Sequence, residues 1–288
     1  MTSVESTTVT YDEIGPRICV TPPYYALDDL LSAASGLAGA TVPVQTSTGR
    51  QVTHVNIAEA GRHLAILGLC AASSVNPRPE RHYYLAHRGV GRMYPPAAAL
   101  TTLHGTASAR MTGRNRAFAE TELHDADGNL VARLDLEYLV MSSSVFRRLM
   151  GPATAPDATE PANPYSARAP LTDIAVDTRG GAAKLTVEPS MCRGHFTGHP
   201  ALPVSVAGYA TFELFDHVLE AAAGPDAGWQ AGIFRLQADH LASAGQTCTV
   251  DVEPSEPEEP ELHDRAFTGT LRSGDRTVFS IQVDYTTV

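Results

Sequence analysis

The segment 195–203, His-Phe-Thr-Gly-His-Pro-Ala-Leu-Pro, combines residue types that can do chemistry with residue types that stiffen a loop. An imidazole titrates near neutral pH, so His195 is a candidate general base. The glycine and the two prolines are expected to fix the loop, because glycine permits turns and proline restricts the backbone. An apolar pattern of helical period follows at residues 206–222. The segment therefore predicts a rigid loop that presents a histidine just before a helix.

The chain also contains an internal repeat. The triplet Arg-Ala-Phe occurs at 116–118 and again at 265–267, and each copy opens a strand, a polar turn and a second strand. The copies begin 149 residues apart, and the tyrosines that close them, Tyr138 and Tyr285, lie 147 residues apart. Such a repeat predicts two similar halves.

An offset of about 150 residues, close to both of these spacings, relates the two halves. It aligns Tyr209 with Glu59, which lies in the helical run 57–72, and it aligns His195 with Gln45. The first half therefore holds a carboxylate without a histidine, and the second half holds a histidine without a carboxylate. If the halves face each other, His195 and Glu59 complete one site. The second site, with Gln45 and Tyr209, is not expected to be catalytically active.

The segment 195–203 resembles the H-F-x-G-H-P-x-x-P motif of the β-hydroxyacyl-acyl-carrier-protein dehydratases, and Glu59-Ala60 resembles the Glu-Ala pair of that family's helix. The resemblance implies a hotdog fold, with His195 as the catalytic base and Glu59 as the catalytic acid across the interface between two hotdogs. It also implies that a backbone N–H at the start of the second helix holds the thioester oxygen. The family has glycine there, whereas this chain has Val204, whose side chain narrows the approach of the substrate to this N–H.

Four residues are expected to contact the substrate, namely Val204, Gly198, His63 and Tyr209. His63 lies four residues after Glu59 and replaces a glutamine of the family, so a hydrogen-bonded structural histidine is the simpler interpretation. Tyr209 keeps a hydroxyl that can donate a hydrogen bond. Gly198 is expected to act through the geometry of the loop.

The element pattern predicts an α+β protein, a double hotdog with two antiparallel sheets that each wrap around a central helix. Residues 1–150 form the expected N-terminal hotdog with Glu59, and residues 171–288 form the C-terminal hotdog with His195. Residues 151–170 are rich in proline and lack a periodic apolar pattern, which is typical of a linker. A short amphipathic helix is also predicted at 25–35.

Composition limits the function classes. The chain has 288 residues, 43% of them apolar, and a net charge of −11. The negative charge argues against nucleic acid as a partner. The absence of a long apolar run argues against a membrane span. Four scattered cysteines predict reduced thiols and a cytoplasmic protein, and neither a metal nor another cofactor is expected.

The leading hypothesis is a dehydratase, or the reverse hydratase, for 3-hydroxyacyl thioesters of fatty-acid or polyketide type. The acyl group would be carried on phosphopantetheine, either of an acyl carrier protein or of coenzyme A. Three alternatives stay open: a hotdog thioesterase that uses Glu59, a related polyketide cyclase, and a non-catalytic protein that binds an acyl chain or scaffolds a partner. A homodimer of double hotdogs is an open assembly.

Overall fold

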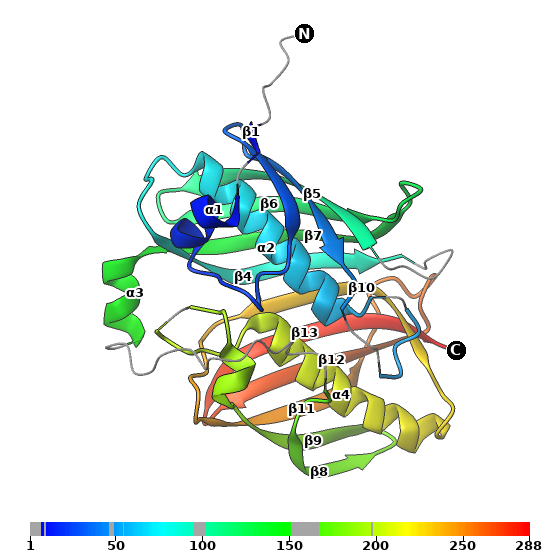
Figure 1. Cartoon of the computed structure of the whole chain (residues 1–288). Helices are drawn as coiled ribbons and strands as arrows, with labels where there is room; N and C mark the ends of the chain where they lie inside the picture. The colour runs from blue at the N-terminus through cyan, green and yellow to red at the C-terminus, as the bar shows by residue number, and fades with distance from the viewer. Residues whose placement is uncertain are drawn as a thin grey trace.

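The computed structural model describes residues 7–8, 10–45, 49–53, 55–94, 102–150, 167–196 and 198–288. Within these ranges the chain forms helices and strands in an α+β arrangement (Figure 1). The helices are α1 (Tyr11–Ile18), α2 (Ile57–Val75), α3 (Ser143–Met150) and α4 (Val204–Ala223), with a short 3-10 turn at Pro189–Cys192. The strands are β1 (Thr7–Thr8), β2 (Asp28–Ala33), β3 (Leu37–Pro43), β4 (His82–Met93), β5 (Thr102–Gly113), β6 (Arg116–His124), β7 (Leu130–Ser142), β8 (Leu171–Asp177), β9 (Gly180–Thr186), β10 (Trp229–Ala238), β11 (Thr247–Ser255), β12 (Arg265–Ser273) and β13 (Arg276–Thr287).

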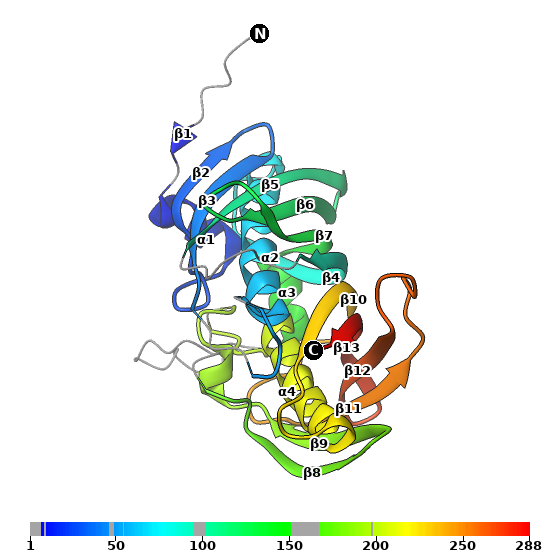
Figure 2. The ribbon, with the colours of Figure 1, turned by 90° about the vertical axis from the view of Figure 1, so that its right-hand side faces the viewer.

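The described strands make one antiparallel sheet of 13 strands, in the order β1-β2-β3-β5-β6-β7-β4-β10-β13-β12-β11-β9-β8. The long helices α2 and α4 lie against the same face of this sheet (Figure 2). Helix α2 packs on β3, β5, β6 and β7, whereas α4 packs on β8, β9 and β11. The two helices also contact each other, which places the core between them and the sheet.

The prediction of two separate sheets is wrong, because the sheet is continuous. Strands β4 and β10 join its two parts by antiparallel pairing, from Arg92 opposite Ile233 to Arg88 opposite Gln237. An unpaired strand edge exposes backbone N–H and C=O groups, and this pairing satisfies them on both strands. The sequence predicts strands but carries no signal for which edges meet.

Both long helices were predicted, and the structure confirms them. Helix α2 begins after Asn56, whose side chain accepts a hydrogen bond of 2.7 Å from the Glu59 N–H. Helix α4 ends at Gly224, which has φ 94° and donates its N–H to the Glu220 carbonyl. Most residues on every side of both helices are buried, which agrees with their broad apolar patterns.

The prediction of a helix at 25–35 is wrong. Strand β2 occupies that segment and pairs with β3 across a turn at Gly36. Gly36 has φ 82°, and a Cβ there would lie 2.3 Å from the Ala109 carbonyl oxygen, so the turn needs glycine. Pairing with a neighbouring strand outweighs the weak local preference for a helix. Helices α1 and α3 were not predicted.

In the sheet, β1–β7 are contiguous and β8–β13 follow them. Most of the predicted linker, 151–166, lies outside the described residues, so the division at 151–170 stays a prediction. Helices α2 and α4 begin at positions 57 and 204, which are 147 residues apart. Glu59 is therefore the third residue of its helix and Tyr209 the sixth, so the offset of 150 does not give them equivalent helix positions.

A buried carboxylate links the first half of the chain to α4. Asp216 accepts hydrogen bonds from the Arg50 backbone N–H and from the indole N–H of Trp229, both of 2.8 Å. Trp229 is fully buried, and the Cβ of any residue at position 49 would lie 2.2 Å from an Asp216 oxygen. The carboxylate therefore fixes residues 49–53 against the second half.

We expect Asp216→Ala to lower the free energy of unfolding by about 1–3 kcal/mol, because it leaves two donors without an acceptor. The matched control is Glu220→Ala on the same helix, which removes an exposed ion pair to Arg50 and should cost at most about 1 kcal/mol. Urea unfolding of both variants measures the difference. Equal losses would show that Asp216 does not hold the two halves together.

Candidate functional site

A cavity of about 510 Å³ lies between α2, α4 and the sheet. Its wall comes from both halves of the chain and is mainly apolar. The lining includes small residues of both helices, namely Ala58, Gly61 and Ala65 of α2 and Gly208 of α4. These small residues leave space where larger side chains would fill the contact between the helices. We call this space the central cavity.

His195 lines the central cavity. Its Nδ1 lies 3.0 Å from the Ala201 carbonyl oxygen, and because a carbonyl only accepts, Nδ1 carries the proton. Nε2 is then the atom that can accept a proton. Burial lowers the pKa of His195 to about 4, although the bond to Ala201 opposes this shift. The imidazole is therefore neutral at pH 7 and has the protonation state of a base.

The His195 loop is held by the first half of the chain. The Thr21 N–H donates to the Gly194 carbonyl at 2.8 Å, and Val20 pairs with His195 in an antiparallel bridge. Gly194 has φ 72°, and a Cβ there would lie 2.1 Å from the Thr21 carbonyl oxygen. Glycine is required for this approach, so the backbone of residues 19–21 sets the position of the histidine.

The start of α4 also borders the cavity. Pro203 is the N-cap residue and offers no capping side chain, and Val204 and Ser205 line the wall. The first N–H groups of a helix have no intrahelical partner, and the helix dipole makes this end partly positive. The arrangement suits an oxygen that gains negative charge during a reaction.

Two residues beside His195 were missed by the sequence analysis. Tyr24 and Ser205 both line the cavity, and their hydroxyls are hydrogen-bonded at 2.9 Å. The Tyr24 ring meets the His195 ring edge-on, with centroids 5.2 Å apart. Tyr24 lies far from the motif in the sequence, so no local pattern connects it with His195.

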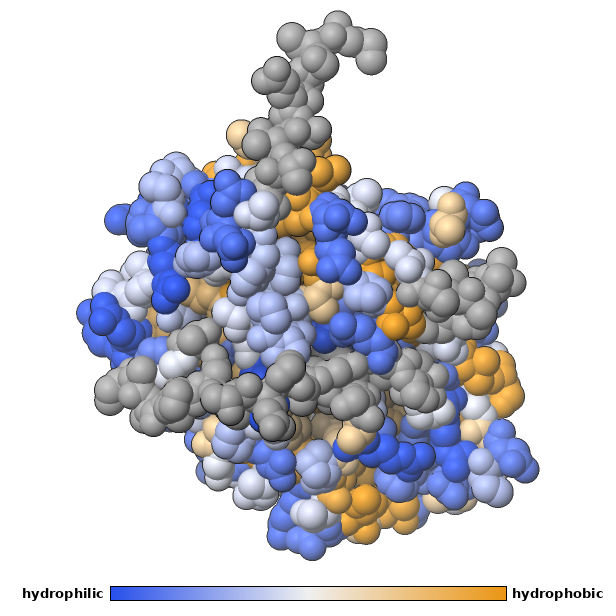
Figure 3. Space-filling view, in the orientation of Figure 1, coloured by the Kyte–Doolittle hydropathy of each residue, from blue (hydrophilic) through white to orange (hydrophobic). Residues whose placement is uncertain are grey.

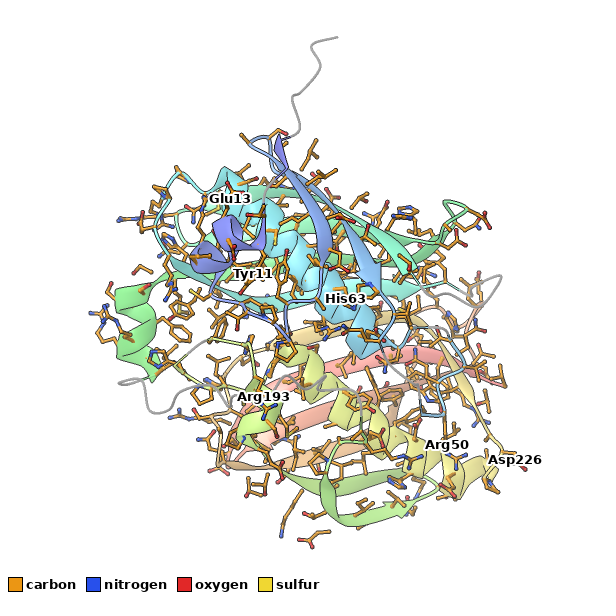
Figure 4. All side chains as sticks on the ribbon, viewed as in Figure 1. Tyr11, Glu13, Arg50, His63, Arg193 and Asp226 are labelled. Carbon is orange, nitrogen blue, oxygen red and sulfur yellow. The ribbon has the colours of Figure 1, made fainter. Side chains whose placement is uncertain are left out.

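Glu59 belongs to a different cluster. Its side chain and those of Arg62 and His63, all on α2, are fully buried. The Gln45 N–H donates to a Glu59 carboxylate oxygen, and Arg62 donates to the Gln45 side-chain carbonyl. None of these four residues is among the described residues that line the central cavity. Figure 4 labels His63 on α2.

His63 contacts the charged residues of this cluster. Its Nε2 lies 3.0 Å from Arg62 Nη2 and 3.6 Å from a Glu59 carboxylate oxygen. A guanidinium only donates, so Nε2 accepts from Arg62 and the longer contact with Glu59 is not a hydrogen bond of the neutral ring. Burial lowers the pKa of His63 to about 4, and the neighbouring Glu59 only partly opposes this shift.

The remaining predicted residues divide between the cavity and other surroundings. Val204 lines the cavity together with His195, whereas Gly198 and Tyr209 are absent from the described lining. Gly198 has φ 79° and serves the turn of the loop. Tyr209 is buried near Glu213, and burial raises the pKa of both side chains. The cavity thus brings together His195 and Val204, and it does not include Glu59.

Other kinds of site find no support in the described ranges. No group of three or more His, Cys, Asp or Glu side chains in these ranges could hold a metal ion. Among the helices that the structure describes, none combines the length and the apolar character that crossing a membrane requires. The described surface in Figure 3 is mostly hydrophilic, with separate apolar patches.

No protein-family model matches the sequence, and no curated protein matches it. Solved structures do match the fold. An acyl-ACP thioesterase from Bacteroides thetaiotaomicron is 12% identical with a TM-score of 0.55, over 87% of this chain and 98% of that one. A 12:0-ACP thioesterase from Umbellularia californica is 12% identical with a TM-score of 0.52, over 88% and 95%. A protein of unknown function with the hotdog fold from Alicyclobacillus acidocaldarius is 11% identical with a TM-score of 0.51, over 88% and 93%.

These identities are low, so the likeness shows the fold alone. It extends over most of each chain, and the protein has the hotdog fold. The prediction of that fold from segment 195–203 is confirmed.

The burial of His63 predicts a pH dependence of stability. The folded pKa of about 4 lies below the ordinary value of 6.5, so the unfolded chain binds more protons between these values. The free energy of unfolding therefore falls as pH decreases from 6.5 towards 4, by up to about 1.4 kcal/mol per pH unit for this residue. Urea unfolding at pH 7, 6 and 5 should show a shallower decrease for His63→Gln than for the wild type. Parallel curves would contradict this role of His63.

Proposed function

We propose that this protein acts on acyl groups carried as thioesters, and that His195 is the general base. The proposed reaction is the dehydration of 3-hydroxyacyl thioesters or the reverse hydration. Removing water from such a substrate needs a base at the α-carbon and a hydrogen bond to the thioester oxygen as enolate character develops. The single observation that carries the proposal is the neutral His195, with a fixed tautomer, in the wall of an apolar cavity.

Two further features support an acyl thioester as the substrate. The central cavity of about 510 Å³ is mainly apolar, which suits an acyl chain. The start of α4, at Val204, faces the cavity beside His195 and could hold the thioester oxygen. The carrier would be an acyl carrier protein or coenzyme A.

Glu59 was predicted as the acid of this reaction. Its carboxylate contacts Gln45 and lies near His63, and it does not line the cavity among the described residues. The proposal therefore keeps His195 as the base and gives Glu59 a structural role, in which it holds the start of α2 against Gln45.

The second candidate is an acyl thioesterase. It is favoured by the fold, because the acyl-ACP thioesterases described above share it over most of their length. In that reaction His195 Nε2 would take a proton from water, which then attacks the thioester carbon. From the sequence, Glu59 was assigned as the carboxylate of this thioesterase, but Glu59 does not line the described cavity wall.

One assay separates these functions. The protein is incubated with 3-hydroxybutyryl and crotonyl thioesters of coenzyme A and of a carrier protein, while enoyl absorbance and free thiol are followed together. A change in enoyl absorbance without thiol release supports the dehydratase, and thiol release supports the thioesterase. If neither signal changes, the cavity only binds.

We expect His195→Ala to lower kcat/KM for the dehydratase reaction on the order of 10²-fold or more, because it removes the general base. The matched control is His104→Ala, a histidine on the exposed face of β5, which should keep the wild-type rate. The low pKa of His195, about 4, further predicts that the wild-type rate persists well below pH 6.5. Full activity of His195→Ala would rule out this function for the loop.

A further inference from the structure

We propose that Tyr24 is the second catalytic residue of the His195 site and protonates the departing 3-hydroxyl group. This inference rests on the proposed dehydratase function and supplies the acid that Glu59 was predicted to be. Tyr24 comes from the first half of the chain and His195 from the second. The site is thus still shared between the halves, but through another residue.

The position of Tyr24 is built into the contact between the halves. Tyr24 follows Thr21, whose N–H donates to Gly194, and it is buried with an exposed fraction of only 6%. The Tyr24 and His195 rings lie with their centroids 5.2 Å apart, and both line the central cavity. The two side chains therefore border the same space, where both can face one bound acyl group.

Ser205 and Arg62 favour proton donation by Tyr24. The Ser205 hydroxyl lies 2.9 Å from the Tyr24 hydroxyl and can donate to it, which leaves the Tyr24 proton available to another acceptor. Burial raises the pKa of Tyr24, so it remains protonated at pH 7. The Ser205 bond and the positive charge of Arg62 oppose this shift, and both would stabilise the phenolate that forms transiently.

The step balances with these two residues. His195 Nε2 takes the α-proton, the electron pair forms the α,β double bond, and the bond from the β-carbon to oxygen breaks. The oxygen leaves as water with the proton from Tyr24. The imidazolium then returns its proton to the phenolate, and both residues regain their starting state.

The test compares two neighbouring tyrosines in the full-length protein. Tyr24→Phe should lower kcat for the dehydration of 3-hydroxybutyryl-CoA on the order of 10²-fold, the usual scale for losing a general acid. The control is Tyr25→Phe, since Tyr25 is equally buried, packs on Tyr11 and is absent from the described cavity wall. Tyr25→Phe should stay within about threefold of the wild type, and Ser205→Ala should fall between the two.

A second measurement separates acid catalysis from structural support. Butyryl-CoA has no 3-hydroxyl, so exchange of its α-hydrogens in D₂O, followed by mass spectrometry, reports on the base alone. Tyr24→Phe should keep this exchange, whereas His195→Ala should lose it. If Tyr24→Phe dehydrates at the wild-type rate, or loses exchange as well, the inference is overturned while the role of His195 stands. Full dehydration by His195→Ala, or thiol release as the sole wild-type reaction, would overturn the proposed function together with the inference.

Discussion

The close contact between residues 19–21 and the His195 loop is the constraint on which the site depends. His195 belongs to the second half of the chain, but its backbone pairs with Val20, and the Gly194 carbonyl accepts from Thr21. A Cβ at Gly194 would collide with the Thr21 carbonyl, so this contact is possible only with glycine. The same contact places Tyr24 beside the imidazole. Neither half could form this group of residues alone, and the β4–β10 pairing that makes the sheet continuous keeps the halves in register.

Local features of the sequence predicted the parts of the structure that local forces decide. Segment 195–203 predicted a rigid loop before a helix, because its prolines restrict the backbone and its glycine permits the turn. The resemblance of this segment to the dehydratase motif implied the hotdog fold. The long apolar runs predicted α2 and α4, since a helix buried on most sides needs such a run. The strands closed by Tyr138 and Tyr285 were predicted from alternating apolar and polar residues, and burial alternates along parts of β7 and β13. The strand β2 was missed because its conformation is set by pairing with β3.

The place of Glu59 outside the cavity wall could not be predicted in this way, because it depends on which side of α2 faces the cavity. Glu59 and Ala58 are neighbours in the sequence, but only Ala58 lines the described cavity wall. Successive residues on a helix point about 100° apart. A shift of one position therefore decides whether a carboxylate faces the cavity or points away from it. The helix starts, 147 residues apart, align Glu59 with Val206 and Arg62 with Tyr209. The predicted match of Glu59 with Tyr209 was three positions away from this alignment.

The two halves also differ in what fills the space beside their helices. Residues 49–53 are fixed against α4, since Val52 donates to the Trp229 carbonyl at 2.8 Å and Trp229 donates to the Arg50 carbonyl at 3.0 Å. There the indole of Trp229 packs edge-on against Phe215, with ring centroids 5.1 Å apart, and large rings occupy the volume. On the side of His195 the cavity wall includes Gly61 and Ala65, and these small residues leave space between the helices.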